Sequence, residues 1–250
     1  MIIINDKISE QLVFDDGFYF GKALFETILV LEKPVFLKEH LERLNKGLEL
    51  LKINKKITEE YINRVISEKE IKNQVLKITV SVKNIVINTR PITYTDEEYK
   101  NGFKLCFSEV IRNSTSMLSY VKSVNYIENI IEKEKAMDKG FQEVIFANEH
   151  GKICEGSCSN IFFIKNKNIY TPKVSCGILT GVVRAWVINN YKVEEGEYDI
   201  NNLLESDEIF ITNSIMGIMK VKTLNDRVYD DQITKGIMDY YFKTLDEDYR

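Results

Sequence analysis

Cysteine and histidine are scarce in this chain, and their scarcity excludes two classes of protein. Four cysteines and two histidines among 250 residues form no disulfide framework of the kind that stabilises small secreted domains. Cys154 and Cys158 are close enough in sequence to suggest a metal, but no paired cysteine or histidine set completes a zinc site. We therefore predict reduced thiols, no bound metal and a cytoplasmic location.

A strong excess of one charge and long apolar runs are also missing. The formal net charge is −4, so no basic face is expected and nucleic acid is not a predicted partner. Residues 1–7 form a short apolar run broken by charge, unlike a signal peptide. No uninterrupted apolar stretch approaches the length of a membrane span, so no membrane partner is predicted either.

Hydrophobic residues, by contrast, are plentiful. They make up 44% of the chain, which is ample for one large domain or two smaller domains with cores of their own. Leucines at three- and four-residue steps over residues 37–51 predict an amphipathic helix, and alternation over residues 76–82 predicts a half-buried strand. A polar segment at residues 112–116 is the predicted boundary between a small N-terminal α/β domain, residues 1–114, and a larger C-terminal domain, residues 115–250. Because helices and strands are mixed, the predicted fold class is α+β with two domains.

Further helices are predicted from residues that commonly begin or end a helix. Thr58 and Thr95 have the position and type of N-cap residues, and Gly181 precedes a helical pattern that ends near Tyr191. A helix over residues 125–139 is predicted to bury one apolar face, which consists of Ile127, Ile130, Ile131 and Met137.

Lys122 is the predicted catalytic residue. It ends an irregular segment, directly before the helix of residues 125–139. A lysine amine forms Schiff bases with carbonyl groups, and pyridoxal phosphate carries such a group. A protein that uses this cofactor must also hold its phosphate, set the charge on its pyridine nitrogen and fix the face of its ring. The chain has 34 lysines and arginines, so the prediction depends on partners that supply these functions.

Two candidate partners would bind the ring itself. Glu155 stands at a Glu-Gly-Ser corner, where a carboxylate can face inward. Paired with the ring nitrogen, it would favour the protonated pyridinium, the stronger electron sink; the alternative is an exposed glutamate in an ordinary turn. Tyr126, one helical turn past Lys122, either hydrogen-bonds the phenolic oxygen of the ring or packs as a core aromatic residue.

Candidates for holding the phosphate lie in three places. Gly181, Val182 and Val183 open a predicted helix, where free backbone N–H groups and the helix dipole attract anions. Ser214, in a loop after a predicted strand, can add a hydroxyl, and Arg43 can add a charge-assisted pair. Each candidate has a simpler alternative interpretation. Gly181 can be an ordinary turn before a helix, Ser214 an ordinary polar loop residue and Arg43 a solvated surface charge.

The ordered motifs of the chain resemble a known family. They are Asp15-x-Gly17-x-x-x-Gly21, Leu24-Phe-Glu-Thr27, His40-Leu-Glu-Arg-Leu44, Lys122-x-x-Asn-Tyr126, Glu155-Gly-Ser, Ser159-Asn-Ile-Phe162, Tyr170-Thr-Pro172, Gly177-x-Leu-x-Gly-x-x-Arg184 and Thr212-Asn-Ser-x-Met-Gly-Ile-Met219. In this order they are similar to the class IV, or fold type IV, pyridoxal-phosphate enzymes. Each motif alone is weak, but the ordered set spans nearly the whole chain and is specific.

The resemblance implies a homodimer of two-domain subunits with the cofactor between the domains. The roles it implies are Lys122 for the Schiff base, Glu155 for the pyridine nitrogen, Tyr126 for the ring oxygen, and Arg43, Val182, Val183 and Ser214 for the phosphate. Departures from the family pattern occur at Asp16, at Lys22-Ala23 and at Lys220. The first two concern the entrance loop and substrate contacts rather than the cofactor.

Within the family, motifs such as Lys-Ser-Val-Asn-Tyr and Tyr-Thr-Pro are most similar to the 4-amino-4-deoxychorismate lyases. This similarity implies conversion of aminodeoxychorismate into p-aminobenzoate and pyruvate, a step of folate biosynthesis, with Lys122 moving the proton and Thr27 helping to position the substrate. Arg90 and Arg112, predicted to lie in loops, are candidates for binding a substrate carboxylate. One alternative is a class IV aminotransferase acting on branched-chain or D-amino acids. Another is a non-catalytic binding module, against which Lys122 and Glu155 argue.

Overall fold

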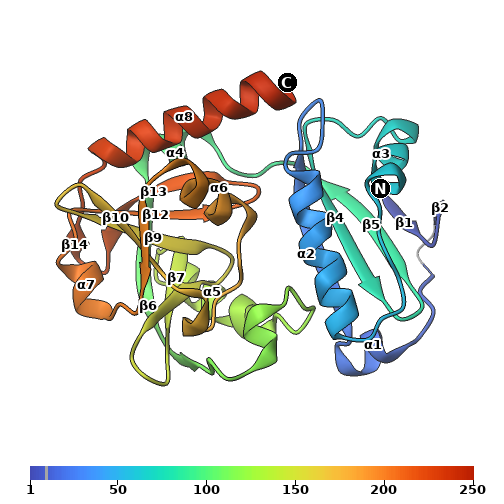
Figure 1. The fold of residues 1–250 in the computed structure, drawn as a ribbon, viewed down its shortest axis with the longest axis horizontal. Coiled ribbons are helices and arrows are strands. Elements are labelled where there is room, and N and C mark those ends of the chain that lie inside the picture. The colour runs from blue at the N-terminus through green and yellow to red at the C-terminus, as the bar shows by residue number, and fades with distance from the viewer. Residues whose placement is uncertain (9–10) are drawn as a thin grey trace. The chain divides into compact units, whose positions relative to one another are not determined.

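The computed structural model describes residues 1–8 and 11–250, and the chain divides into two compact units. The first unit comprises residues 1–93, 121–125 and 244–250, and the second comprises residues 94–120 and 126–243. The α+β prediction is confirmed, because the first unit contains a small antiparallel sheet and the second a larger, curled mixed sheet, each with helices (Figure 1). The division into domains at residues 114 and 115 stays a prediction.

The described part of the first unit forms a sheet in the order β2-β1-β5-β4-β3, with antiparallel neighbours. Its strands are β1 (Ile2–Ile4), β2 (Lys7–Ile8), β3 (Ala23–Val30), β4 (Gln74–Ser81) and β5 (Ile85–Arg90). Its helices are α1 (Asp16–Phe20), α2 (Leu37–Leu50) and α3 (Glu59–Glu68). Helix α2 and strand β4 lie where the hydrophobic periodicity predicts them.

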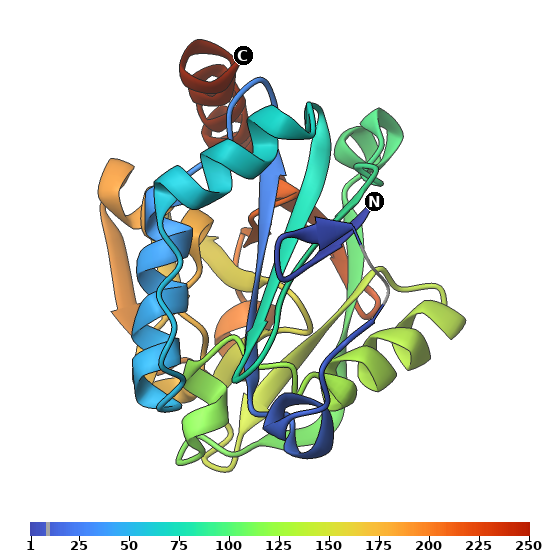
Figure 2. The ribbon, with the colours of Figure 1, turned by 90° about the vertical axis from the view of Figure 1, so that its right-hand side faces the viewer.

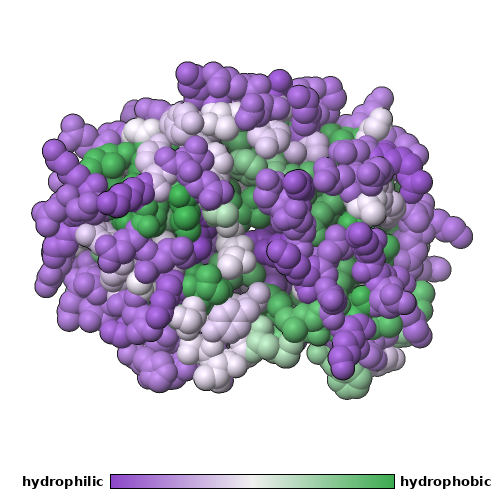
Figure 3. Space-filling view, in the orientation of Figure 1, coloured by the Kyte–Doolittle hydropathy of each residue, from purple (hydrophilic) through white to green (hydrophobic). Residues whose placement is uncertain are grey.

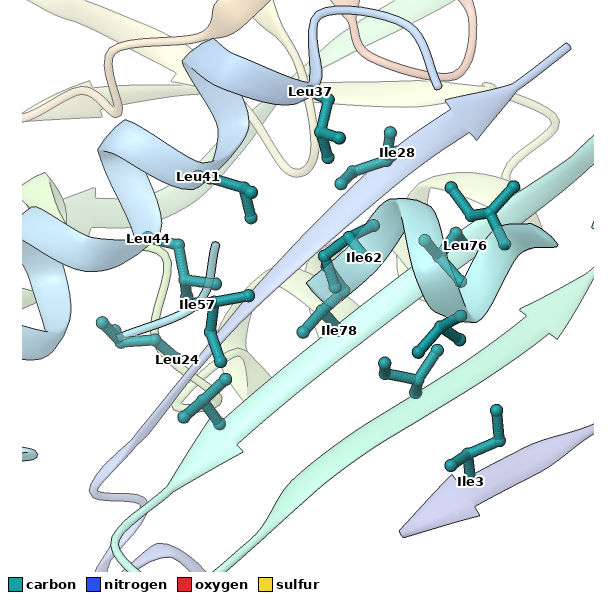
Figure 4. Packing of buried hydrophobic residues seen from close by; sticks show 14 of the residues in the cluster. Ile3, Leu24, Ile28, Leu37, Leu41, Leu44, Ile57, Ile62, Leu76 and Ile78 are labelled. Atoms are coloured by element: carbon teal, nitrogen blue, oxygen red, sulfur yellow. The ribbon is translucent and has the colours of Figure 1, made fainter. Parts of the chain in front are cut away.

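Helices α2 and α3 lie on one face of this sheet and share a hydrophobic core with it (Figure 2). The predicted leucine stripe is confirmed, because the α2 residues that face the sheet are buried: Leu37, Leu41, Leu44 and Leu48. Figure 4 shows the first three of them directed towards Ile28 and Leu24 of β3. Thr58 caps α3 as predicted, since its hydroxyl accepts a hydrogen bond from the Tyr61 amide at 3.3 Å.

The sheet of the second unit runs in the order β11-β10-β9-β12-β13-β6-β7-β8, with β14 paired to β13. Its strands are β6 (Phe103–Arg112), β7 (Glu143–Asn148), β8 (Ile153–Gly156), β9 (Asn160–Lys165), β10 (Asn168–Pro172), β11 (Val193–Gly196), β12 (Glu208–Asn213), β13 (Gly217–Leu224) and β14 (Arg227–Val228). Strand β6 pairs in parallel with β13 and β7, and β10 pairs in parallel with β11. The sheet is therefore mixed.

The helical elements after residue 94 differ in how they begin. They are α4 (Asp96–Asn101), the 3₁₀ turns η1 (Met117–Tyr120) and η2 (Val174–Cys176), α5 (Ile127–Asp138), α6 (Val182–Asn190), α7 (Ile200–Leu204) and α8 (Gln232–Tyr249). Helices α4 and α7 have side-chain caps, whereas α5 and α6 do not. The predicted capping box before α4 is confirmed, since Thr95 and Glu98 bond each other's backbone. Among the helices of the described residues, none has the length and apolar character needed to cross a membrane.

The predicted buried face of α5 is wrong. Its apolar residues are exposed by 42% to 66%: Ile127, Ile130, Ile131 and Met137. The buried residues are instead Asn129, Glu132 and Ala136. Asn129 donates to a backbone carbonyl, and Glu132 accepts from the Ser108 hydroxyl at 2.6 Å. Periodicity located an apolar stripe correctly, but hydrogen bonds to the neighbouring strand and corner decide which side of the helix faces inward.

Replacing Gly217 with alanine is expected to lower the free energy of unfolding by about 3 kcal/mol. Gly217 has φ +68°, which disfavours side chains, and a Cβ there would lie 2.4 Å from Cε1 of the fully buried Tyr241 ring. The measurement is denaturant unfolding, with Gly151→Ala as the control. Gly151 has the same φ, but a Cβ at this position would have no heavy atom within 4 Å, so its loss should be only about 1 kcal/mol. Equal losses at the two sites would contradict the packing argument.

Candidate active site

Lys122 lies in an extended segment that pairs with the start of β3. The Phe25 amide donates to the carbonyl oxygen of Lys122 at 2.9 Å, and the Val124 amide donates to the Ala23 carbonyl at 3.0 Å. The Lys122 side chain is half-buried, and its Nζ lies 4.5 Å from the centre of the Phe25 ring. Pairing with a strand therefore fixes the backbone from which this amine projects.

Thr27 and Lys77 share a face of the first unit's sheet with Phe25. Side chains alternate along a strand, so Phe25 and Thr27 point to the side opposite Glu26. Lys77 of β4 is the register partner of Thr27, and its Nζ lies 4.6 Å from the Phe25 ring. Burial lowers the pKa of Lys77. The amines of Lys77 and Lys122 thus both lie close to one aromatic ring, an arrangement favourable to each cation.

Arg43 belongs to a buried polar cluster with Glu26 and His40. His40 and Arg43 are three residues apart on α2 and therefore face the same way. Nε and Nη2 of Arg43 each donate to the Glu26 carboxylate at 2.8 Å, and Nδ1 of His40 lies 2.6 Å from it. No role was predicted for Glu26 or His40, although both lie in motifs that carry the family resemblance.

Glu155 lies in β8 and is bound to the loop that precedes α6. Its Oε2 accepts hydrogen bonds from the Leu179 amide at 3.0 Å and from Nδ2 of Asn160 at 3.1 Å. Asn160 also donates to the Leu179 carbonyl at 2.9 Å. A Cβ on Gly181 would lie 2.0 Å from Oδ1 of Asn160, so only glycine permits this close approach. Asn160 thus brings together the carboxylate of Glu155 and the start of α6.

Gly181, Val182 and Val183 open α6 as predicted. Gly181 is the N-cap residue, and no side chain caps the helix. The first amides of a helix have no acceptor within it, and the helix dipole adds to their attraction for anions. The side chains of Val182 and Val183 are buried, so their backbone amides are the groups suited to a phosphate.

Ser214 lies, half-buried, in the tight turn between β12 and β13. Oδ1 of Asn213 shapes this turn by accepting from the amides of Ile215 at 3.0 Å and Met216 at 2.8 Å. Helix α6 packs against β12, the strand that leads into the turn. The structure therefore places Ser214 on an element that neighbours α6.

Tyr126 is the N-cap residue of α5, and the segment before it is not helical, contrary to the predicted helical turn. Its hydroxyl donates to the Ser157 carbonyl at 2.7 Å, and Asn129 donates to the same oxygen at 2.6 Å. Burial raises the pKa of Tyr126 well above its usual value, so the phenol keeps its proton. A phenol has one proton to donate, so Tyr126 can donate to the ring oxygen of the cofactor only if it turns away from the Ser157 carbonyl. That carbonyl would still accept the hydrogen bond from Asn129.

Glu143 is a buried carboxylate that holds the corner after Glu155, and no role was predicted for it. Only 1% of Glu143 is exposed. It accepts from the Ser157 amide at 3.0 Å, from the Ser157 hydroxyl, from the Ser159 hydroxyl at 3.0 Å and from the Cys158 thiol at 3.2 Å. These bonds fix the direction in which the chain leaves Glu155. A single glutamate at the start of a strand carried no sequence signal for such a role.

Cys158 itself is an unsuitable nucleophile. Nζ of Lys133 donates to its sulfur at 3.1 Å, but burial raises the pKa of the Cys158 thiol to about 11. The thiol therefore stays protonated near neutral pH and reacts slowly. Across residues 1–8 and 11–250, histidine, cysteine and carboxylate side chains form no group of three or more that could hold a metal ion.

The predicted loop positions of Arg90 and Arg112 are wrong, because each is the last residue of a strand. Arg90 ends β5 and is exposed. Arg112 ends β6, with its guanidinium 4.0 Å from the centre of the Phe146 ring. The departure residues Asp16 and Lys22 form an exposed ion pair at 3.9 Å, which adds little stability.

Comparisons with known proteins agree with the motifs. Residues 23–224 match the family described as amino-transferase class IV. The chain is 29% identical to the aminodeoxychorismate lyase of Bacillus subtilis (strain 168), over 98% of this chain and 94% of that protein. It is 25% identical to the D-alanine aminotransferase of Bacillus licheniformis, over 90% and 88%. Its fold matches the crystal structure of 4-amino-4-deoxychorismate lyase from Pseudomonas aeruginosa with a TM-score of 0.88, over 99% of both chains at 21% identity.

The fold and the site define a fold type IV enzyme that uses pyridoxal phosphate. The chain belongs to the class IV aminotransferase family, because the family match spans most of its length. The residues present fit the cofactor, since they include a half-buried lysine amine, a helix start without a side-chain cap and a hydrogen-bonded carboxylate. The role of each individual residue stays a proposal.

Proposed function

We propose that the protein is a lyase that converts 4-amino-4-deoxychorismate into p-aminobenzoate and pyruvate. The observation that carries the proposal is the face of the first unit's sheet on which Lys122, Lys77 and Thr27 surround Phe25. The substrate has two carboxylates, and a face on which the Lys77 amine lies beside the residue that holds the cofactor suits such an anion better than a neutral amino-acid side chain. Arg90, whose charge further lowers the pKa of Lys77, adds to the positive potential.

Lys122 is the residue that both holds the cofactor and moves the proton. Its ε-amine would hold pyridoxal phosphate through the aldehyde of the cofactor. The same amine would act as the base that removes the proton from the substrate carbon that bears nitrogen. Loss of the enolpyruvyl group as pyruvate makes the product aromatic, so no second keto acid is consumed.

The remaining residues hold and tune the cofactor. Bound pyridoxal phosphate supplies an electron sink, and the Glu155 carboxylate would keep its ring nitrogen protonated. The amides of Gly181, Val182 and Val183, the Ser214 hydroxyl and the Arg43 guanidinium would bind the phosphate. Tyr126 would donate to the phenolic oxygen, and Thr27 would position the substrate.

The proposal is tested by supplying purified protein with aminodeoxychorismate and measuring p-aminobenzoate and pyruvate together. We expect equal amounts of both products without any added keto acid. The alternative is a class IV aminotransferase, favoured by the similarity to a D-alanine aminotransferase. Consumption of branched-chain or D-amino acids only with a keto-acid acceptor, and no release of p-aminobenzoate, would establish that alternative and exclude the lyase.

A homodimer in the cytoplasm is also proposed. The exposed apolar residues of α5 support association with a second copy, as do those around α1, where the lower right of Figure 3 shows hydrophobic surface. The double substitution Ile127→Glu, Ile131→Glu is expected to weaken self-association by at least about 100-fold, because it buries two charges in the contact. Sedimentation velocity over a concentration series measures this change.

The matched control for the dimer is Lys139→Glu, which adds an acidic charge at an exposed polar position near the end of the same helix. This variant is expected to self-associate like the parent protein. A parent protein that sediments as a monomer at high concentration would contradict the proposed homodimer. So would a double variant that dimerises unchanged.

A further inference from the structure

Glu26, His40 and Arg43 form an ionic cluster inside the hydrophobic core of the first unit. The side chains of Glu26 and His40 are 0% and 1% exposed, and that of Arg43 is 14% exposed. Leu24 and Ile28, which flank Glu26 on the same side of β3, are both core residues. Removing charges from water is costly, and apolar replacements for buried ion pairs are often neutral or stabilising. Stability therefore does not explain the cluster, and its geometry is the informative property.

Glu26 binds the guanidinium of Arg43 side-on. Nε donates to Oε1 and Nη2 donates to Oε2, each at 2.8 Å. Two parallel charge-assisted bonds fix both the plane and the rotation of the guanidinium group. Because this group is planar, the pairing directs its third nitrogen, Nη1, away from the Glu26 carboxylate.

His40 fixes Glu26 in turn. Its Nδ1 lies 2.6 Å from Oε2 of Glu26, and burial lowers the pKa of the imidazole. The ring is therefore neutral near pH 7 and donates its Nδ1 proton to the carboxylate. Oε2 accepts from both His40 and Arg43, so the carboxylate cannot rotate without losing bonds to both.

The cluster is close to the amine proposed to hold the cofactor. Phe25, whose ring centre lies 4.5 Å from Nζ of Lys122, directly precedes Glu26 in β3, although its side chain points to the opposite side of the strand. The positive charge of Lys122 is also one of the causes that lower the pKa of His40. All these residues belong to the first unit. The charge of Lys122 therefore acts on the cluster, and an arginine held rigidly here lies within electrostatic range of that amine.

We propose that Glu26 is a positioning residue that holds Arg43 in the orientation needed to bind the phosphate of pyridoxal phosphate. The inference rests on the proposed function, in which Arg43 binds that phosphate. Glu26 does not touch the phosphate, since two anions would repel each other. It acts by removing the rotational freedom that Arg43 would otherwise lose on binding.

The test compares two cofactors that differ only in the phosphate. Cofactor-free protein is titrated with pyridoxal phosphate and, separately, with pyridoxal, and the dissociation constants are read from absorbance. For Glu26→Gln we expect the affinity for pyridoxal phosphate to fall about tenfold or more, because the amide cannot accept from all three donors. The affinity for pyridoxal should change less than about threefold, because Lys122 still binds the aldehyde.

Two further variants show whether Glu26 acts through Arg43. In an Arg43→Gln background, Glu26→Gln should cause no additional loss of pyridoxal phosphate affinity. Glu26→Asp, which keeps the charge but shortens the side chain, should give an intermediate loss and serves if the glutamine variant does not fold. Glu42→Gln is the control, since Glu42 is exposed and adjacent to Arg43 on α2; it should leave both affinities unchanged.

Equal losses of affinity for the two cofactors would overturn the proposal, because Glu26 would then support the fold rather than the phosphate contact. Loss of the folded state in both Glu26 variants, seen by circular dichroism, would overturn it as well. Additive losses with Arg43→Gln would do the same. These binding measurements are separate from turnover: a phosphate-specific loss in a protein that makes no p-aminobenzoate would refute the proposed lyase activity and leave the role of Glu26 intact.

Discussion

Replacing Lys122 with alanine is expected to lower turnover by about 10⁴-fold or more, because the change removes both the covalent attachment and the proton carrier. The fold should survive. The alanine keeps the backbone bond to the Phe25 amide, and the lost cation–π contact is worth only about 1 kcal/mol. The measurement is the rate of p-aminobenzoate and pyruvate release, with circular dichroism to confirm the folded state.

Borohydride reduction gives an independent test of the same residue. It should trap the cofactor on the peptide that contains Lys122, as identified by mass spectrometry, and Lys122→Ala should show no trapped cofactor. Lys152→Ala, at a lysine that is not assigned to the site, is the control and should behave like the parent protein. A cofactor trapped on any other lysine of the parent protein would overturn the assignment.

Replacing Glu155 with alanine is expected to slow turnover by about 100-fold, mainly at proton removal, because the ring nitrogen would lose the carboxylate that keeps it protonated. A larger primary isotope effect with substrate deuterated at the carbon that bears nitrogen would locate the slow step. The alanine also breaks the bonds to the Leu179 amide and to Asn160, so a structural loss must be separated from an electronic one.

Glu155→Gln makes that separation. Its amide oxygen can still accept from Leu179, but it carries no charge to stabilise the pyridinium. We expect it to unfold at the temperature of the parent protein and still to turn over about 100-fold more slowly. Unchanged turnover in the glutamine variant would mean that the ring nitrogen has another partner.

The helices that the sequence predicted well are those whose signals are local. The leucine stripe of α2 repeats every three to four residues, and Thr58 and Thr95 cap helices within one turn of their own positions. Such signals depend on side chains that are neighbours in the chain, so no knowledge of the rest of the molecule is needed to interpret them.

The face of α5 could not be predicted in the same way. Ile127, Ile130 and Ile131 form a genuine apolar stripe, yet they are exposed in the single chain. The side that packs inward is polar, because Asn129 and Glu132 find hydrogen-bond partners there. A periodic pattern identifies an apolar side but not the element that covers it, which here we propose to be a second subunit.

The residues of the candidate site also fall into those that the sequence predicted and those that only the structure revealed. Lys122, Glu155 and the start of α6 were predicted from ordered motifs, because the chemistry of a cofactor limits which residue types can serve it. Glu143 and Lys77 were not found. Each depends on a contact with residues distant in sequence, the former with the corner at Ser157–Ser159 and the latter with Phe25.

By itself, the sequence determined several helices and strands through periodicity and capping residues, and the family through ordered motifs, and it also led to the prediction that Lys122 is the amine that binds the cofactor. Tertiary structure alone decided which buried carboxylates hold those groups in place. Glu26 and Glu143 carry no local pattern that separates them from the other acidic residues of the chain. They become distinct only when folding removes them from water. Arg43 and His40 are then the hydrogen-bond donors to Glu26, and the Ser157 amide is a donor to Glu143.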